Sequence, residues 1–189
     1  GRAHKAVGIS LGLNCRAGIA TAYPHPNQFF YTRLARGQAV QISGVIRIGG
    51  YGGEGYRALH IAPMDDLQKK LWEVHTEMTL KQAELSRAGV RCQEVAEAVL
   101  SLAQKAGLEK YVYHRPAHGQ GMEGHQAPYI ALGDETVLQE GMTFSNEPGL
   151  YNLEGGYGYN HSNCVLVGRE RGEIMNRTPL TREFCWLKL

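Results

Sequence analysis

Two helical segments in the middle of the chain, flanked on both sides by strand-like segments, most constrain the fold. Over residues 65–87 apolar side chains recur every three or four positions, after Pro63 and before Gly89, which predicts one helix. A second helix is predicted over residues 92–106, where Gly107 ends it. An order of strands, two helices and further strands indicates an α+β fold, with the helices packed on one face of a mainly antiparallel sheet.

The flanking segments alternate in polarity or are rich in β-branched residues, as strands are. Strands are predicted over residues 7–13, 37–51, 111–114, 126–132, 141–146 and 163–168, and the tail at 174–187 is predicted as one more strand with turns. The segment 37–51 fits either a single strand or a hairpin. With 189 residues, no internal linker and no repeat, the chain 1–189 is predicted to form a single domain with its own core.

The composition excludes several classes of protein. Lysine and arginine number 20 against 18 acidic residues, and no basic stretch is interleaved with aromatics, so no nucleic-acid partner is expected. No apolar run approaches the ~20 residues that cross a bilayer, so no membrane partner is expected either. The four cysteines lie far apart and form no CxxC pair, which fits reduced thiols and a cytoplasmic location.

Residues that can bind metal or transfer protons gather in two glycine-rich stretches, HGQGMEGHQAP and SNEPG. His118 and His125 have an odd separation, which in a strand would place them on opposite faces. The glycines between them allow the chain to bend, so that both side chains reach one cavity. Glu147 precedes Pro148 and Gly149, which fix the direction of its carboxylate. Each of these residues alone also fits a structural role, as an ordinary core histidine or a solvated glutamate at a turn.

His25 lies between Pro24 and Pro26, which hold the backbone extended. Such a residue presents its side chain rigidly into a site, although an ordinary loop histidine explains the pattern equally well. Imidazole titrates near neutral pH, so His25, His118 and His125 are candidate acid–base groups.

Five segments, taken in order, resemble the catalytic domain of the pita-bread hydrolases: TAYPH, GGYGGEGYRA, HGQGMEGHQAP, FSNEPGLY and NHSNCVLV. That superfamily includes methionine aminopeptidase, aminopeptidase P, prolidase and creatinase. The resemblance implies a curved, mostly antiparallel sheet with helices on one face. Family catalytic domains begin with two helices that this sequence lacks, and larger members add an N-terminal domain. The resemblance therefore implies a C-terminal catalytic-type fragment of a longer chain, whose uncovered apolar surface favours a homodimer.

The family's peptidases bind two divalent metals through two aspartates, one histidine and two glutamates. By position, His118 matches the histidine and Glu147 matches the first glutamate. Ser43 and Glu54 occupy the two aspartate positions, and Ser162 occupies the position of the final glutamate. The resemblance therefore implies a degraded metal site.

Charge decides what this ligand set can hold. Two carboxylates bring about −2 against the +4 of two divalent ions, which would repel each other strongly in a low-dielectric pocket. We therefore expect no dinuclear centre. A single ion (Zn²⁺, Mn²⁺ or Co²⁺) held by Glu54, His118 and Glu147 is the alternative to a site without metal, since three protein ligands and an open position suit catalytic zinc.

The resemblance also assigns residues that contact substrate. His25 and His125 match two family histidines, of which the first contacts substrate and the second steadies the tetrahedral intermediate. Glu54 and His161 are predicted to bind the substrate.

Three functions remain open. The first is a hydrolase of C–N bonds in a small peptide or an amidino or amide substrate, working without a metal pair as creatinase does. Its catalytic residues would be His25, His118, His125 and Glu147. The second is an Xaa-Pro aminopeptidase or dipeptidase with a weakened metal site. The third is a non-catalytic module that binds peptides or proteins, against which the retention of three histidines argues.

Overall fold

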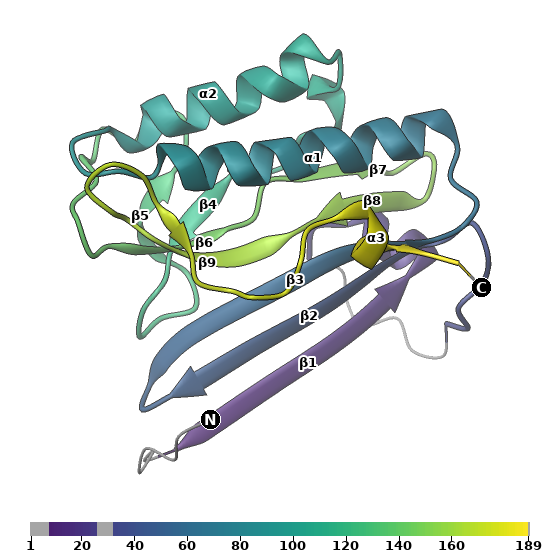
Figure 1. Cartoon of the computed structure of the whole chain (residues 1–189), viewed down its shortest axis with the longest axis horizontal. Helices are drawn as coiled ribbons and strands as arrows, with labels where there is room; N and C mark the ends of the chain where they lie inside the picture. Colours follow the sequence, from purple (N-terminus) through teal and green to yellow (C-terminus); the bar gives the residue numbers. More distant parts are fainter. Residues whose placement is uncertain (1–7, 26–31, 189) are drawn as a thin grey trace.

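The computed structural model describes residues 8–25 and 32–188, and its layers are visible in Figure 1. The strands of the main sheet are β1 (Ile9–Ala17), β2 (Ala39–Ile48), β3 (Tyr51–Ile61), β4 (Ala117–Gly119), β5 (Gln126–Ile130), β6 (Thr143–Asn146), β9 (Ser162–Leu166), β10 (Glu173–Ile174) and β11 (Trp186–Leu187). This nine-stranded sheet has the order β1-β2-β3-β9-β6-β4-β5, with β10 beside β9 and β11 parallel to β3. A separate hairpin contains β7 (Gly149–Asn152) and β8 (Tyr157–Asn160).

The helices lie together on one side of the sheet. They are α1 (Asp66–Leu85), α2 (Cys92–Lys105) and the short α3 (Arg182–Cys185), with 3-10 turns η1 (Gly18–Ala22) and η2 (Glu109–Tyr111). In Figure 1, α1 and α2 run side by side above the sheet, while the long ribbon of β1, β2 and β3 extends beyond their cover. None of the helices in the described ranges is long and apolar enough to cross a membrane.

Helix α1 begins at a capping box and docks directly on the sheet. The Asp65 side chain accepts a hydrogen bond from the Gln68 N–H (2.7 Å), and the Gln68 side chain accepts one from the Asp65 N–H (2.8 Å). One turn later, the indole N–H of Trp72 donates to the carbonyl of Ala58 on β3 (2.9 Å). The helix therefore has a fixed start and a fixed position over β3.

The strand register decides which side chains share a face of the sheet. Tyr56 pairs with Ser162, Ser145 pairs with Cys164, and His118 pairs with Ser145. Because paired residues point to the same face and alternate residues do too, one face carries a set of polar side chains. That set consists of Glu54, Tyr56, His118, Ser145 and Ser162. The opposite face of the same strands carries the buried apolar residues Ala117, Phe144 and Val165.

The sequence-based prediction of an α+β fold with helices on one face of an antiparallel sheet is confirmed. The segment 37–51 belongs to a hairpin, which turns at Gly49 and Gly50, both with positive φ. The strand predicted at 111–114 is wrong: a 3-10 turn occupies its start, and the rest pairs with no strand in the described chain. The predicted tail strand is two short pieces, β10 and β11, separated by α3.

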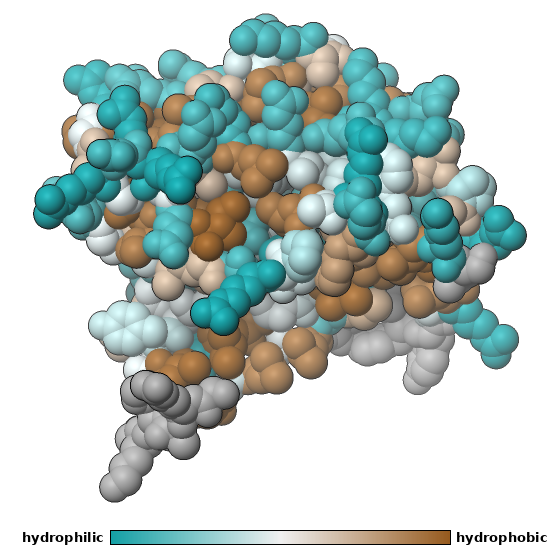
Figure 2. Space-filling model, viewed as in Figure 1, coloured by the Kyte–Doolittle hydropathy of each residue, from teal (hydrophilic) through white to brown (hydrophobic). Residues whose placement is uncertain are grey.

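One face of the β1–β2 ribbon is apolar and exposed. Leu13 is 74% exposed, and two apolar cross-strand pairs, Ile9 with Ile48 and Leu11 with Ile46, extend the same surface. Figure 2 shows hydrophobic side chains gathered over this lower part of the molecule. Helix α1 does not reach this far along the ribbon, so this surface is bare in the described structure.

Candidate active site

His118 and two glutamates form the buried centre of the polar face. His118 comes from β4, Glu54 from β3, and Glu147 from the link between β6 and β7. The Nε2 atom of His118 lies 3.3 Å from Oε1 of Glu147 and 3.8 Å from Oε1 of Glu54. All three side chains are buried. Three chain segments far apart in sequence therefore bring one imidazole and two carboxyl groups together away from water.

The backbone fixes which nitrogen of His118 faces the carboxyl groups. Its Nδ1 lies 3.1 Å from the carbonyl oxygen of Gly119, which can only accept, so Nδ1 carries a proton. Nε2 then faces Glu147 and Glu54. An unprotonated nitrogen facing two carboxylate oxygens is repelled, so Nε2 needs a second proton or a metal ion.

The two partners shift each other's pKa in opposite directions. Burial disfavours the charged form of His118, but the hydrogen bond and the charge of Glu147 outweigh it and raise the pKa of His118. Burial likewise acts to raise the pKa of Glu147, but the hydrogen bond and charge of His118 outweigh it and lower that pKa. The pair is therefore poised to hold a cation at Nε2 of His118.

Glu54 is held in a network of hydroxyl groups. Its Oε1 accepts hydrogen bonds from Ser145 and from Ser162 (2.9 Å), and its Oε2 accepts one from Tyr56 (3.3 Å). Burial, followed by the negative charge of Glu147, raises the pKa of Glu54 to about 7. Glu54 can thus be protonated or ionised near neutral pH.

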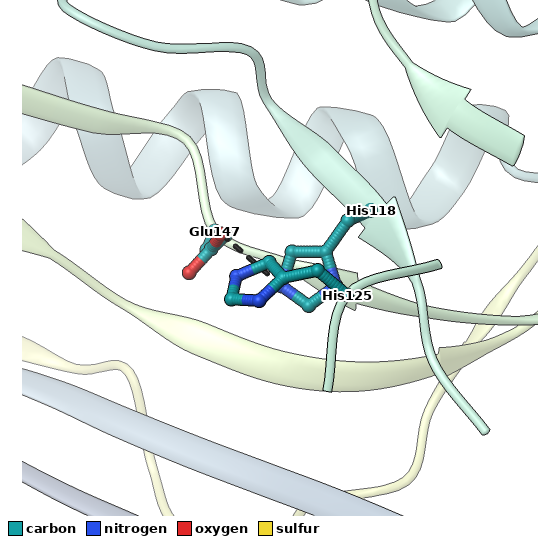
Figure 3. A group of neighbouring side chains, drawn as sticks. All are labelled: His118, His125 and Glu147. Atoms are coloured by element: carbon teal, nitrogen blue, oxygen red, sulfur yellow. Dashed lines mark ion pairs between the residues drawn. The ribbon is translucent and has the colours of Figure 1, made fainter. Parts of the chain in front are cut away.

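His125 reaches the same site because the chain bends between the two histidines. The register of β4 with β5 shifts between His118 and Gly119. A side chain at Gly119 would meet the carbonyl oxygen of Gln126 at 2.7 Å, so this close approach requires glycine. The imidazole rings of His118 and His125 lie 3.9 Å apart, between centroids, and point toward Glu147 (Figure 3). The predicted convergence of the two histidines is confirmed, and His125 is the exposed member.

Two further histidines surround His125. The ring of His25 lies 6.1 Å from that of His125 and 6.3 Å from that of His114. Sequence reasoning missed His114, whose Nδ1 donates to the carbonyl of Arg115 (2.7 Å) and whose Nε2 accepts from the Tyr151 hydroxyl (2.9 Å). Its position four residues before His118 in YHRPAH was the available signal. His114 is locked by these bonds, whereas His25 is exposed.

The prediction that His161 binds substrate is corrected by its position. Its ring is fully buried, 4.4 Å from the ring of His75 and 5.6 Å from that of Trp72, both on α1. Its Nδ1 accepts a hydrogen bond from the Ala58 N–H (3.2 Å). His161 therefore belongs to the packing between helix and sheet and has no surface to offer a substrate.

The donor atoms that could share a metal ion differ from the expected set. Among the described residues, His118, His125 and Glu147 have ligand atoms that all lie within 4.8 Å of one another. The sequence-based set had Glu54 in place of His125. Two ligands about 2.1 Å from a tetrahedral zinc ion lie about 3.4 Å apart, which agrees with the 3.3 Å between His118 and Glu147. Two histidines and one glutamate form a known donor set for catalytic zinc.

Ser43 and Ser162, which the sequence resemblance predicts at family carboxylate positions, add no charge to this group. Ser43 is buried on β2 and pairs in register with Tyr56, while Ser162 donates its hydroxyl to Glu54. A hydroxyl in place of a carboxylate leaves one negative charge fewer for a second cation. The residues present therefore fit one divalent ion better than two.

Comparisons with a family model, with known sequences and with solved structures agree on one family. The sequence model of metallopeptidase family M24 matches residues 2–169. An Xaa-Pro dipeptidase from Lactobacillus helveticus is 32% identical over 129 residues, covering 68% of this chain and 35% of that enzyme. A probable dipeptidase PepE from Mycobacterium bovis is 33% identical over 140 residues, covering 71% of this chain and 37% of that protein. The crystal structure of the prolidase from Pyrococcus horikoshii OT3 superposes with a TM-score of 0.84 at 25% identity, covering 92% of this chain and 50% of that one. The chain thus spans half or less of the length of these relatives.

Proposed function

The chain belongs to metallopeptidase family M24, and from that premise we propose that it hydrolyses the C–N bond of small dipeptides of the Xaa-Pro type. The observation that carries the proposal is the buried pair of His118 and Glu147, with the exposed His125 directly beside it. This arrangement combines a fixed cation site with a histidine that a substrate can reach. The similarity to the Xaa-Pro dipeptidase from Lactobacillus helveticus supports the choice of substrate.

The proposal includes one divalent ion, Zn²⁺, Mn²⁺ or Co²⁺, held by His118, His125 and Glu147. When bound, such an ion supplies a Lewis acid for a carbonyl oxygen or a water molecule. The carbonyl of Gly119 keeps the proton of His118 on Nδ1 and leaves Nε2 for the ion. We propose no second ion, because hydroxyl groups occupy the positions where a second ion would need carboxylates.

The remaining site residues position the substrate and move protons. His25 lies on the open side of the site, where it can hydrogen-bond to a substrate or give a proton to a leaving amine. Glu54, whose Oε1 lies 3.8 Å from Nε2 of His118, is close enough to exchange a proton with a group bound beside it. His114 acts as a positioning residue, since Tyr151 and the backbone hold its ring in one orientation.

Metal content and hydrolysis, measured together, test the proposal. We expect about one ion per chain and turnover of an Xaa-Pro dipeptide in the metal-loaded protein. His118→Ala should lose the ion and lower kcat at least about a hundredfold. Glu147→Gln should also lose the ion, whereas the matched variant Glu54→Gln should keep it. Two ions per chain, or loss of the ion in Glu54→Gln but not in His125→Ala, would contradict the proposed ligand set.

The other two functions predict different results in the same assay. A creatinase-like hydrolase would turn over a small amidino or amide substrate with no metal bound. A binding module would bind peptides and would hydrolyse none of them, whichever divalent ion is added. Either result would replace the dipeptidase proposal.

A further inference from the structure

Arg16 places a positive charge beside the site. The proposed chemistry does not use this charge. Arg16 lies near the end of β1 and pairs with Gln41 on β2. The residue two positions before it, Asn14, pairs with Ser43, which in turn pairs with Tyr56. Alternation along β1 therefore points Arg16 to the same face of the sheet as Tyr56 and Glu54.

One end of the guanidinium is anchored to the segment that carries His25. Its Nη1 donates to the carbonyl of Pro24 (3.2 Å) and lies 3.4 Å from that of Tyr23. These bonds use one of the two terminal nitrogens. They hold the planar group next to the exposed His25, at the open side of the site.

The other edge of the guanidinium has no partner among the described residues. Nε is buried without a hydrogen bond, and no carboxylate of the described ranges lies within ion-pair distance of Arg16. The Nε–H and an Nη2–H point in parallel, which is the geometry that binds both oxygens of one carboxylate. A buried donor without an acceptor is costly, so a ligand that supplies two acceptor oxygens is favoured at this edge.

Arg16 stays positively charged, and no neighbouring carboxylate among the described residues neutralises it. Burial lowers the pKa of Arg16, while Tyr151, Tyr56 and Glu147 oppose this change and raise it. An arginine remains a cation throughout the neutral range. Glu147, the carboxylate among these neighbours, is already paired with His118. The charge of Arg16 is thus left for a ligand.

We propose that Arg16 binds the free carboxylate of the substrate and selects dipeptides over longer or amidated peptides. The inference rests on the proposed function, because it names the part of an Xaa-Pro dipeptide that this residue recognises. In a dipeptide the carboxylate belongs to the residue that leaves, so it lies one residue from the bond that breaks. Arg16 is then a specificity residue that contacts substrate and takes no part in proton transfer.

Turnover of an Xaa-Pro dipeptide and of its C-terminal amide tests the proposal in the metal-loaded chain. The chain should prefer the free acid by at least about tenfold in kcat/KM. Arg16→Met should lower kcat/KM for the acid by about 10- to 100-fold, mainly through KM, and leave the amide nearly unchanged. Arg16→Lys should recover part of the preference, because it restores the charge without the planar fork. Arg36→Met, which removes the same charge from an exposed position, should behave as the unsubstituted chain.

Equal losses for acid and amide in Arg16→Met would overturn the proposal, since they would indicate a structural role. A binding measurement distinguishes a failure of the Arg16 proposal from a failure of the proposed function. Proline and prolinamide are titrated calorimetrically into the unsubstituted chain and into folded Arg16→Met, without any turnover. Tighter binding of proline that disappears in Arg16→Met supports the role of Arg16, even if no dipeptide is hydrolysed. Equal binding of the two ligands by the unsubstituted chain overturns it, even if dipeptides are hydrolysed.

Discussion

At the scale of single residues, Glu54 has the most unusual environment of the acidic groups. Its carboxyl is buried among three hydroxyl groups and close to Glu147, and its pKa rises from 4.5 to about 7. A carboxyl whose pKa is raised by folding stabilises the fold fully below its unfolded pKa. That contribution is lost as the pH rises from about 4.5 to about 7.

Glu54→Gln should therefore increase stability at pH 8 and have a smaller effect at pH 4.5. The amide keeps the shape of the side chain and removes the buried charge, which is worth on the order of 1–3 kcal/mol. Urea unfolding with EDTA present, at both pH values, measures the difference without bound metal. Glu170→Gln, at an exposed position, should change nothing at either pH. A Glu54→Gln protein less stable at pH 8 would show that the ionised carboxylate stabilises its neighbours.

The site residues differ in how far the sequence could identify them. His118, His125 and Glu147 follow from local glycine and proline patterns that direct their side chains. Arg16 could not be found this way, because only the register across β1, β2 and β3 brings it to the site. His161 was assigned wrongly because it precedes Ser162. Neighbouring residues in an extended chain point to opposite faces, so Ser162 faces the site and His161 faces α1.

At the scale of elements, α1, α2 and the short strands β5, β6 and β9 were predictable, whereas β4 and β7 were not. A helix of 20 residues, such as α1, repeats its apolar period several times, and its cap is local. Strands such as β4 and β7 have three and four residues, too few to display an alternating pattern. They exist because neighbouring strands supply hydrogen-bond partners.

Removing the cap of α1 should lower stability by a predictable amount. Asp65→Ala removes the bond that the Asp65 carboxylate accepts from the Gln68 N–H, keeps the bond that its own backbone N–H donates to Gln68, and should cost about 1 kcal/mol in the free energy of unfolding. Its neighbour offers a matched control: Asp66 only forms an exposed pair with Lys69, so Asp66→Ala should cost less than about 0.5 kcal/mol. Urea unfolding of the two variants measures both values. Equal losses would show that charge near the helix start, and not the cap, accounts for the effect.

The interface between α1 and the sheet should make the fold sensitive to acid. Burial lowers the pKa of His75 on α1 to about 3, and it lowers that of His161 beside it. The unfolded chain takes up protons near pH 6.5 while these folded groups stay neutral, so stability falls as the pH drops from about 6.5 toward 3.

His75→Leu should therefore make the dependence of stability on pH shallower. Between pH 6.5 and pH 4.5 the difference should approach 1.4 kcal/mol per pH unit, the value for one linked proton. Thermal or urea unfolding across this range measures the slope, whatever the variant does to stability at pH 8. Identical slopes would show that His75 is protonated in the folded protein.

At the scale of the whole molecule, the sheet is covered unevenly. The helices protect β4, β6 and β9, while one face of β1 and β2 presents Ile9, Leu11 and Leu13 to solvent. Contiguous apolar surface of this kind drives association in water. The composition alone could not reveal it, because the residues become one surface only through the pairing of β1 with β2.

The isolated chain should therefore self-associate through this ribbon. Leu11→Lys combined with Leu13→Lys should shift the molecule toward monomer, seen as a lower mass in light scattering at matched concentration. Leu132→Lys changes a leucine that is 63% exposed on another part of the surface and should leave the mass unchanged. A monomer in the unsubstituted chain, with a cooperative melt, would contradict this prediction.

The sequence separation of the contacts around Glu54 has a consequence for the order in which the protein folds. Its carboxyl binds Ser145 and Ser162, which are 91 and 108 positions away along the chain. Contacts between distant parts of a chain form slowly, whereas helices such as α1 and α2 form within about a microsecond. After dilution from denaturant, helical signal should thus return well before the joining of β3 to β9 completes the site. The delay between the two signals measures the duration of the last step of folding, and the joining of the strands can be followed by the fluorescence of Trp72, which donates to β3.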